Sequence, residues 1–443
     1  MGARLYKEFL SCEDHSRMQK ATKDTISFHE YRKRTEKHLS EQEELQPDEC
    51  WERSIKDTLR VLKDRPCNFA IYRVPSRLRK INEDVYNPRI VSIGPFHHGR
   101  EDLLKMEEHK WRYMLSLLGR TRDQVKTLQE FTKGIIKLRD GVPGCYADDL
   151  NMNRNKLMDI LLVDGCFILE LFIRYSDANF RQNGGDETTN GAWMIPTIRH
   201  DLALLENQIP FSVLDLLFSI LESSNGERFP YTLNQYVLLF FHSASLEQTV
   251  PMNPRAREAR HVLEMLHIYY LPSSSKTDDL KEDHTWGFKH CATNLLKSGI
   301  EIEKATGCGG LLEIKFEKGV IQFPTLSIDE TMETIFWNLV AFEQCRVGGT
   351  HHITSYLMLI KGLIASSKDI ELLQKKKIIK ISDRSRGEDV LTFFNSICRE
   401  VVLKDFYFAK ICEDVNHYTQ SWWHFHRIKA HLGVPWCNCV VGR

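Results

Sequence analysis

Three histidines that lie close together in the sequence could bind a metal: His97, His98 and His109. Side chains of adjacent residues usually point apart, and no cysteine or carboxylate stands at ligand spacing to complete a tetrahedral site. We therefore predict no metal and no other cofactor. The imidazoles should instead hydrogen-bond backbone groups of the surrounding proline- and glycine-rich segment, which cannot pair with itself as a regular ladder.

Four acidic residues fall within apolar helical segments: Asp164, Glu170, Asp201 and Glu206. Paired carboxylates could act as general acid and base or bind a cation. A buried charge needs a partner whatever its role, and arginine offers a bidentate one. We expect structural pairing rather than catalysis, with candidate partners at Arg73, Arg77 and Arg79.

Other sequence signals for chemistry are weak. Cys437 and Cys439 could bind metal with a nearby histidine or carry a lipid, but C-x-C spacing is less specific than C-x-x-C. Phosphate-loop, nucleophile-elbow and zinc-protease motifs do not occur in the sequence. We predict no catalytic residue.

The composition is that of an ordinary globular protein. Sixty basic and sixty acidic residues cancel, so no global charge favours a nucleic-acid partner. The twelve cysteines are scattered through apolar segments, which indicates reduced core thiols. The longest apolar stretches, 160–173 and 211–221, are shorter than a membrane span and contain acidic residues. These features predict a cytoplasmic protein.

The segment Ile71–Gly99, which we call the clasp, is the organising element of the chain. Pro75, Pro88 and Pro95 prevent a long helix, because proline removes a backbone donor and extends the preceding residue. Between them, residues 90–93 form a short β-branched run that predicts a buried strand. The sequence thus predicts an extended segment that packs on the helices carrying the acidic residues.

The rest of the chain predicts a mainly α fold with a few short strands. Residues 1–47 form a charged tail predicted to be disordered, 48–436 a single α-rich domain, and 437–443 a short tail. Alternation around Gly319 predicts a β-hairpin at 311–323. Helical periodicity covers 51–63, 103–119, 125–138, 155–175, 198–221 with a break at 207–210, 286–298, 330–346, 353–365, 368–376, 389–402 and 408–432.

Several blocks of the chain resemble the plant DUF247 family, also called UPF0481. The clasp reads R-V-P, Y-N-P and V-S-I-G-P-F-H-H-G and is followed by M-E-E-H-K, and further blocks lie at 162–172, 201–211, 338–345 and 353–356. The resemblance implies no established enzymatic activity, and a role in pollen self-incompatibility for some grass members. Family members typically end in one membrane-anchoring helix, which we expect this sequence to lack after Trp436.

We therefore predict a non-enzymatic interaction or recognition protein with an unknown protein partner. It should be cytoplasmic or peripheral as written, and membrane-bound only with a restored anchor or a lipidated tail. The alternative is an enzyme or small-ligand-binding protein that uses a pocket between the clasp and the acidic helices. The structural or functional candidates are Arg73, Pro75, Arg77, Tyr86, Pro88, Gly94, Pro95, His97, His98, Gly99, Glu107, His109, Lys110, Asp164, Glu170, Asp201, Glu206, Asn207, Gln208, Pro210, Asn338 and Glu343.

Overall fold

The computed structural model describes most of the chain from the clasp onward. The described residues are 51–53, 55–56, 59, 69–177, 180, 193–225, 228–241, 254–272, 287–306, 310–346, 348–381 and 387–431. The predicted tails 1–47 and 437–443, with Cys437 and Cys439, lie outside them. Most of the helix predicted at 51–63 also lies outside, and its described positions include Trp51, Ile55 and Leu59, all exposed.

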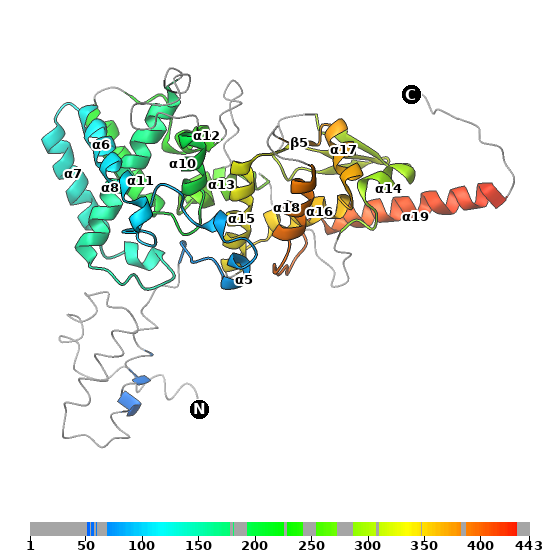
Figure 1. The fold of residues 1–443 in the computed structure, drawn as a ribbon, viewed down its shortest axis with the longest axis horizontal. Helices are drawn as coiled ribbons and strands as arrows, with labels where there is room; N and C mark the ends of the chain where they lie inside the picture. The colour runs from blue at the N-terminus through cyan, green and yellow to red at the C-terminus, as the bar shows by residue number, and fades with distance from the viewer. Residues whose placement is uncertain are drawn as a thin grey trace.

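The described chain is mainly α-helical, as predicted, and is elongated (Figure 1). One end is a group of helices around α8 (Arg154–Ser176), which contacts α6 (Lys105–Gly119), α7 (Gln124–Leu138), α11 (Phe211–Asn225) and α12 (Leu233–Phe241). Helix α8 is buried along most of its length, because apolar residues occupy all sides of it. The apolar run at 160–173 is therefore a core helix.

Helix α10 (Met194–Leu202) lies beside α12, and α13 (Val262–Tyr270) and α15 (Glu330–Cys345) occupy the middle of the molecule (Figure 1). Further helices and the strands lie toward the other end (Figure 1). The far end contains α14 (Ala292–Lys297), α16 (His352–Leu363), α17 (Ser367–Lys375), α18 (Gly387–Ile397) and α19 (Ala409–His431). Short helical turns are α5 (Ser76–Arg79), η1 (Asp84–Tyr86), η2 (Glu101–Leu103), η3 (Val142–Cys145) and η4 (Pro254–Glu258).

The described strands form two small sheets. Strand β3 (Val320–Phe323) pairs antiparallel with β2 (Lys315–Glu317) and parallel with β1 (Glu301–Lys304). The predicted hairpin is thus confirmed, although its first strand begins at Lys315 because Leu311 and Leu312 lie in a turn. Lys318 and Gly319 both have positive φ, 50° and 83°, as a tight two-residue hairpin turn requires. Strands β4 (Leu326–Ile328) and β5 (Ile379–Ile381) pair in parallel.

Some sequence-based predictions of secondary structure are wrong. Residues 90–93 belong to no strand, and Ile90 lies in a bend. The helix predicted at 286–298 spans only Ala292–Lys297, and that at 389–402 ends at Ile397. Strands β4 and β5, and helices α12 and α13, lie where no regular structure was predicted. Both unpredicted helices are buried nearly all round, so they carry no amphipathic pattern.

One connected cluster of buried apolar side chains extends from Ala70 to Val415. Trp337 of α15 lies at its centre, 2% exposed, with edge-on ring contacts to Tyr86 of the clasp and Phe393 of α18. The clasp is therefore joined through the core to helices from both ends of the molecule.

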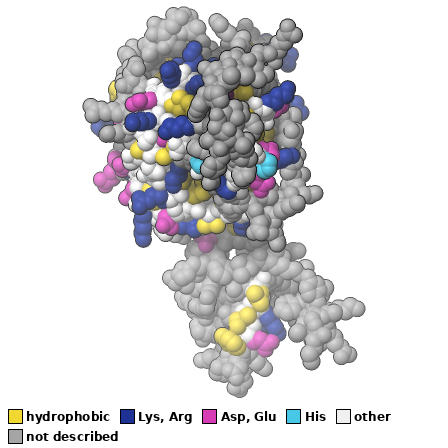
Figure 2. Space-filling view, turned by 90° about the vertical axis from the view of Figure 1, so that its right-hand side faces the viewer, with side chains coloured by type: hydrophobic (Ala, Val, Ile, Leu, Met, Phe, Trp, Pro, Cys, Tyr) yellow, Lys and Arg dark blue, Asp and Glu magenta, His cyan; other side chains and the backbone are white. Residues whose placement is uncertain are grey.

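At the α19 end of the surface, basic and acidic side chains are interspersed (Figure 2).

Candidate functional site

The candidate site is the contact between the clasp and the C-terminal end of α10 together with the loop that follows it. Asp201, at 0% exposure, accepts hydrogen bonds from the backbone N–H groups of Arg89, Ile90 and Val91, each at 2.8 Å. Asn207 accepts from the N–H of Ile93 at 2.6 Å and donates to the carbonyl of Val91 at 3.0 Å. Side chains thus satisfy backbone groups of residues 89–93, which pair with no strand.

Asp164 of α8 continues this pattern at the next clasp residue. Its carboxylate accepts from the N–H of Gly94 at 2.7 Å and pairs with the Lys110 ammonium at 2.7 Å. Lys110 is fully buried and also donates to Glu107 at 2.7 Å and to the carbonyl of Ser92. Burial alone would lower the pKa of Lys110, but the Asp164 and Glu107 carboxylates outweigh it and raise the pKa. A buried cation therefore links the clasp, α6 and α8.

Gly94 passes so close to residues 207–210 that no side chain fits. Its φ is +73°, and a Cβ built there would lie 2.4 Å from the carbonyl oxygen of Gln208. That carbonyl accepts from the Tyr146 hydroxyl at 3.2 Å, and the Gln208 amide donates to the carbonyls of Leu202 and Leu204, both at 2.8 Å. The amides before Pro210 therefore satisfy backbone groups at the break between α10 and α11.

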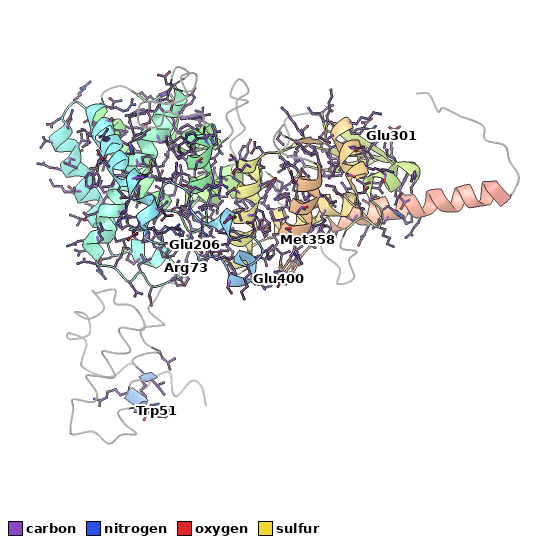
Figure 3. The ribbon with its side chains drawn as sticks, viewed as in Figure 1. Trp51, Arg73, Glu206, Glu301, Met358 and Glu400 are labelled. Carbon is purple, nitrogen blue, oxygen red and sulfur yellow. The ribbon has the colours of Figure 1, made fainter. Side chains whose placement is uncertain are left out.

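Glu206 binds the N-terminal part of the clasp and lies close to Arg73 (Figure 3). Its carboxylate accepts from the N–H of Val74 at 2.6 Å and from Arg79 at 2.7 Å, and Arg73 lies 3.6 Å away. Arg73 is half exposed, pairs with Asp148 at 3.1 Å and lies over the Phe96 ring. The predicted pairing with Arg73 and Arg79 is confirmed. Arg77 instead donates to Gln344, at 3.3 Å, on the surface.

His97 and His98 of the clasp and His109 of α6 were predicted to hydrogen-bond backbone groups, and one ring nitrogen of each makes no such bond. Nε2 of His97, Nδ1 of His98 and Nδ1 of His109 have no hydrogen-bond partner. Burial, together with Arg100, Arg73 and Arg79, lowers the pKa of His97 to about 4. Its Nε2 lies 3.7 Å from Glu206. Within the described residues, no group of three histidine, cysteine or acidic side chains is arranged to hold a metal ion.

The remaining acidic candidates are paired away from the clasp. Glu170 binds Arg120 and Arg174, each at 2.7 Å. Glu343 accepts from His267 at 2.8 Å and from the N–H groups of Ile353 and Thr354, at 2.9 Å each. Although burial raises the pKa of Glu343, these donors lower it below its usual value.

Sequence reasoning missed three of these partners: Arg120, Arg174 and His267. The spacing of Glu170 and Arg174, four residues apart on one helix, was an available signal. His267 and Arg120 are distant in sequence from their partners and gave none.

The other candidates serve the backbone of the clasp and its neighbours. Asn338 of α15 accepts from the N–H of Leu205 at 2.9 Å and donates to the carbonyl of Val85 at 2.9 Å, so it bridges the clasp and the loop after α10. Pro75 precedes α5, Pro210 separates α10 from α11, and Gly99 has a φ of +85° in an exposed turn. The buried candidates of the clasp are Tyr86, Pro88 and Pro95.

These features define a class of α-rich protein in which buried acids and amides hold a proline-rich segment. The family model for DUF247, plant protein of unknown function, matches residues 71–438, and the chain belongs to that family. It is 28% identical over 405 residues to the UPF0481 protein At3g47200 of Arabidopsis thaliana, which covers 84% of this chain and 83% of the relative.

A second relative matches a comparable share of the chain at lower identity. The putative UPF0481 protein At3g02645 of Arabidopsis thaliana is 24% identical over 450 residues, covering 80% of this chain and 83% of the relative. No solved structure matches the chain. None of the helices in the described part of the chain combines the length and the apolar character needed to span a bilayer.

Proposed function

We propose that this protein is a non-enzymatic interaction protein of the DUF247 type, which acts by binding a partner protein, in a signalling or recognition role. The observation that supports the proposal is that the acidic candidates at the clasp are buried and hydrogen-bonded to its backbone. Asp164, Asp201 and Glu206 are each nearly inaccessible, and each accepts from backbone N–H groups of the clasp. Acids held in this way are structural acceptors and are not positioned to exchange protons with a substrate.

The alternative is an enzyme or ligand-binding site at the clasp. The two proposals differ in what they predict for stability when an acid at the clasp is neutralised. Catalytic and ligand-binding groups are commonly strained, and neutralising one often leaves stability unchanged or raises it. A structural acceptor that loses its charge weakens every hydrogen bond it accepts. The Glu206→Gln variant keeps the shape of the side chain and separates these cases.

We expect Glu206→Gln to lower the free energy of unfolding by about 2 kcal/mol, measured by urea denaturation of the full chain. The matched control is Glu108→Gln, an exposed acid with one surface ion pair to Arg112, which should change stability by less than about 0.5 kcal/mol. Equal or higher stability of Glu206→Gln would refute the structural role and favour a ligand site at the clasp.

A second experiment searches for the partner protein with the tagged full chain and with its Glu108→Gln variant. The tagged full chain, purified from plant cells, should retain a stoichiometric protein, and that complex should form again from the two purified components. The Glu108→Gln chain should bind it equally well. Failure of every co-purified protein to rebind as a pure component would contradict the interaction role.

A further inference from the structure

Exposed apolar side chains are concentrated on two neighbouring helices. Eleven large apolar side chains are exposed in the described part of the chain, and six of them belong to α6, α7 and the residue preceding α6. These six, which we call the α6–α7 face, are Leu104, Trp111, Leu115, Val125, Leu128 and Ile136. Single exposed apolar residues are normal, but clusters of them mark interaction sites.

Helical spacing places these side chains on the outer side of each helix. Trp111 and Leu115, 56% and 66% exposed, are one turn apart, and Leu104 lies two turns before Trp111 on the same stripe. On α7, Val125 and Ile136 form a similar stripe, while Phe131 of the same helix is fully buried. Helices α6 and α7 contact each other at the end of the molecule opposite α19 (Figure 1). The stripes are therefore additional to the core-facing sides.

The same two helices carry an excess of positive charge. Their exposed basic residues are Lys105, Arg112, Lys126, Lys133 and Lys137. Within these two fully described helices Glu108 is the one exposed acid, and Arg112 neutralises it at 2.6 Å. The four lysines form no ion pair with any described residue. Glu101, Asp102 and Asp123, which flank the two helices, are also exposed, and Asp102 pairs with Arg100, so the excess of positive charge belongs to α6 and α7 themselves.

We propose that the α6–α7 face docks on an anionic phospholipid membrane. Apolar side chains that include a tryptophan, flanked by lysines on helices lying side by side, fit the boundary between headgroups and acyl chains. Lysine side chains near the surface attract acidic lipids. The face would lie flat on the bilayer, and no helix would cross it.

Charge favours lipid over the other possible occupants. A symmetric dimer through this face would oppose its lysines with the same lysines of a second copy. Protein interfaces are also depleted in lysine relative to the rest of the surface. The inference goes beyond the proposed function, because a chain that binds its partner protein but no membrane would overturn the membrane docking alone.

The test is sedimentation of the full chain with vesicles of phosphatidylcholine, with and without roughly a third phosphatidylserine. We expect binding only to the anionic vesicles, weakened by salt. The variant Trp111→Glu/Leu115→Glu should reduce the partition coefficient about tenfold or more, and Lys126→Gln/Lys133→Gln about tenfold. The matched control is Trp193→Glu, which changes an exposed tryptophan (59%) outside this face.

Each outcome decides the proposal. Binding that is lost in both face variants and kept in the control supports it, provided that thermal unfolding of the variants matches that of the parent. The lysine pair retains the apolar surface, so it tests the same face if the acidic pair fails to fold. No binding, binding unaffected by the face variants, or equal loss in the control overturns it. Self-association abolished by the face variants, without vesicle binding, would instead identify an interface between copies.

Discussion

At the scale of single residues, the protein uses side-chain carboxylates and amides as backbone acceptors. Asp201 alone satisfies three consecutive N–H groups of the clasp, because an ionised carboxylate offers about four acceptor positions. The clasp contains prolines and cannot pair as a strand in the middle of a sheet. Buried acids therefore replace a sheet where the sequence forbids one.

Removing Asp164 should be strongly destabilising. The change Asp164→Ala leaves the fully buried Lys110 ammonium with the partly exposed Glu107 as its remaining carboxylate, and the Gly94 N–H without an acceptor. Removing one member of a buried ion pair costs about 3–5 kcal/mol. We expect urea denaturation of the full chain to show a loss of that size.

The control for Asp164→Ala removes the cation as well. The double variant Asp164→Ala/Lys110→Met should recover part of the loss, because no uncompensated charge remains buried. An unchanged unfolding curve for Asp164→Ala would contradict the structural role and point to a functional one.

His261 should make the protein sensitive to acid. Its Nδ1 accepts from the N–H of Glu264 at 3.2 Å, and Nε2 bonds the Ala70 carbonyl at 2.9 Å, so both nitrogens are occupied in the neutral ring. Burial lowers the pKa of His261 from 6.5 to about 4. The unfolded chain thus binds a proton that the folded chain does not, and stability falls as pH drops from 6.5 to about 4.

The measurement is the free energy of unfolding of the parent and of His261→Asn across that pH range. Asparagine can still cap α13 but does not titrate. The parent should lose up to about 3 kcal/mol more than the variant on acidification. Parallel pH profiles of the two proteins would rule out His261 as the responsible group.

At the scale of elements, hydrophobic periodicity correctly predicted helices that have one buried and one exposed side. Helices α7 and α16 begin and end within a residue or two of the predicted bounds, since each alternates core and solvent positions. Helix α12 is buried nearly all round and was missed. The strand predicted at 90–93 is absent for a different reason: the backbone N–H groups of Ile90 and Ile93 donate to the side chains of Asp201 and Asn207 and not to another strand.

The sequence predicted which residues form the candidate site better than it predicted which of them pair with each other. The sequence identified Asp164 and Lys110 separately, yet proposed arginines as the partners of the acids. Glu206 does bind Arg73 and Arg79, but Arg77, between them in sequence, points to the surface. Arg77 and Arg79 lie two residues apart on the short helix α5, so their side chains point in different directions, and composition does not specify which of them reaches Glu206.

Because the clasp lies so close to residues 207–210, we expect that no side chain fits at Gly94. In Gly94→Ala the Cβ would meet the Gln208 carbonyl oxygen at 2.4 Å, in a backbone conformation with φ of +73°. Because the obstacle is backbone, we expect a loss of about 3 kcal/mol or more in unfolding free energy. The matched control is Gly99→Ala, with φ of +85° and no atom within 4 Å of the added Cβ.

Gly99→Ala should cost about 1 kcal/mol, the conformational strain alone. Chemical denaturation of both variants gives the comparison. Equal losses in the two proteins would show that the close contact at Gly94 contributes nothing beyond its φ angle.

At the scale of the whole molecule, the clasp joins the two ends of an elongated chain. Tyr86 contacts Trp337, and Trp337 in turn contacts Phe393 of α18. Asn338 bonds both the clasp at Val85 and the loop at Leu205. With one connected core from Ala70 to Val415, we predict a single cooperative unfolding transition for residues 48–436.

That prediction also concerns residues 1–47, which lie outside the described part of the chain. Their composition, rich in charged residues and poor in large apolar ones, predicts no contribution to the core. Deleting them should leave one transition in urea and calorimetry, with the free energy of unfolding changed by less than about 0.5 kcal/mol. As a positive control in the truncated chain, Trp337→Ala should cost about 3–5 kcal/mol. Loss of the cooperative transition on deletion would mean that the tail packs on the core and that the predicted boundary is wrong.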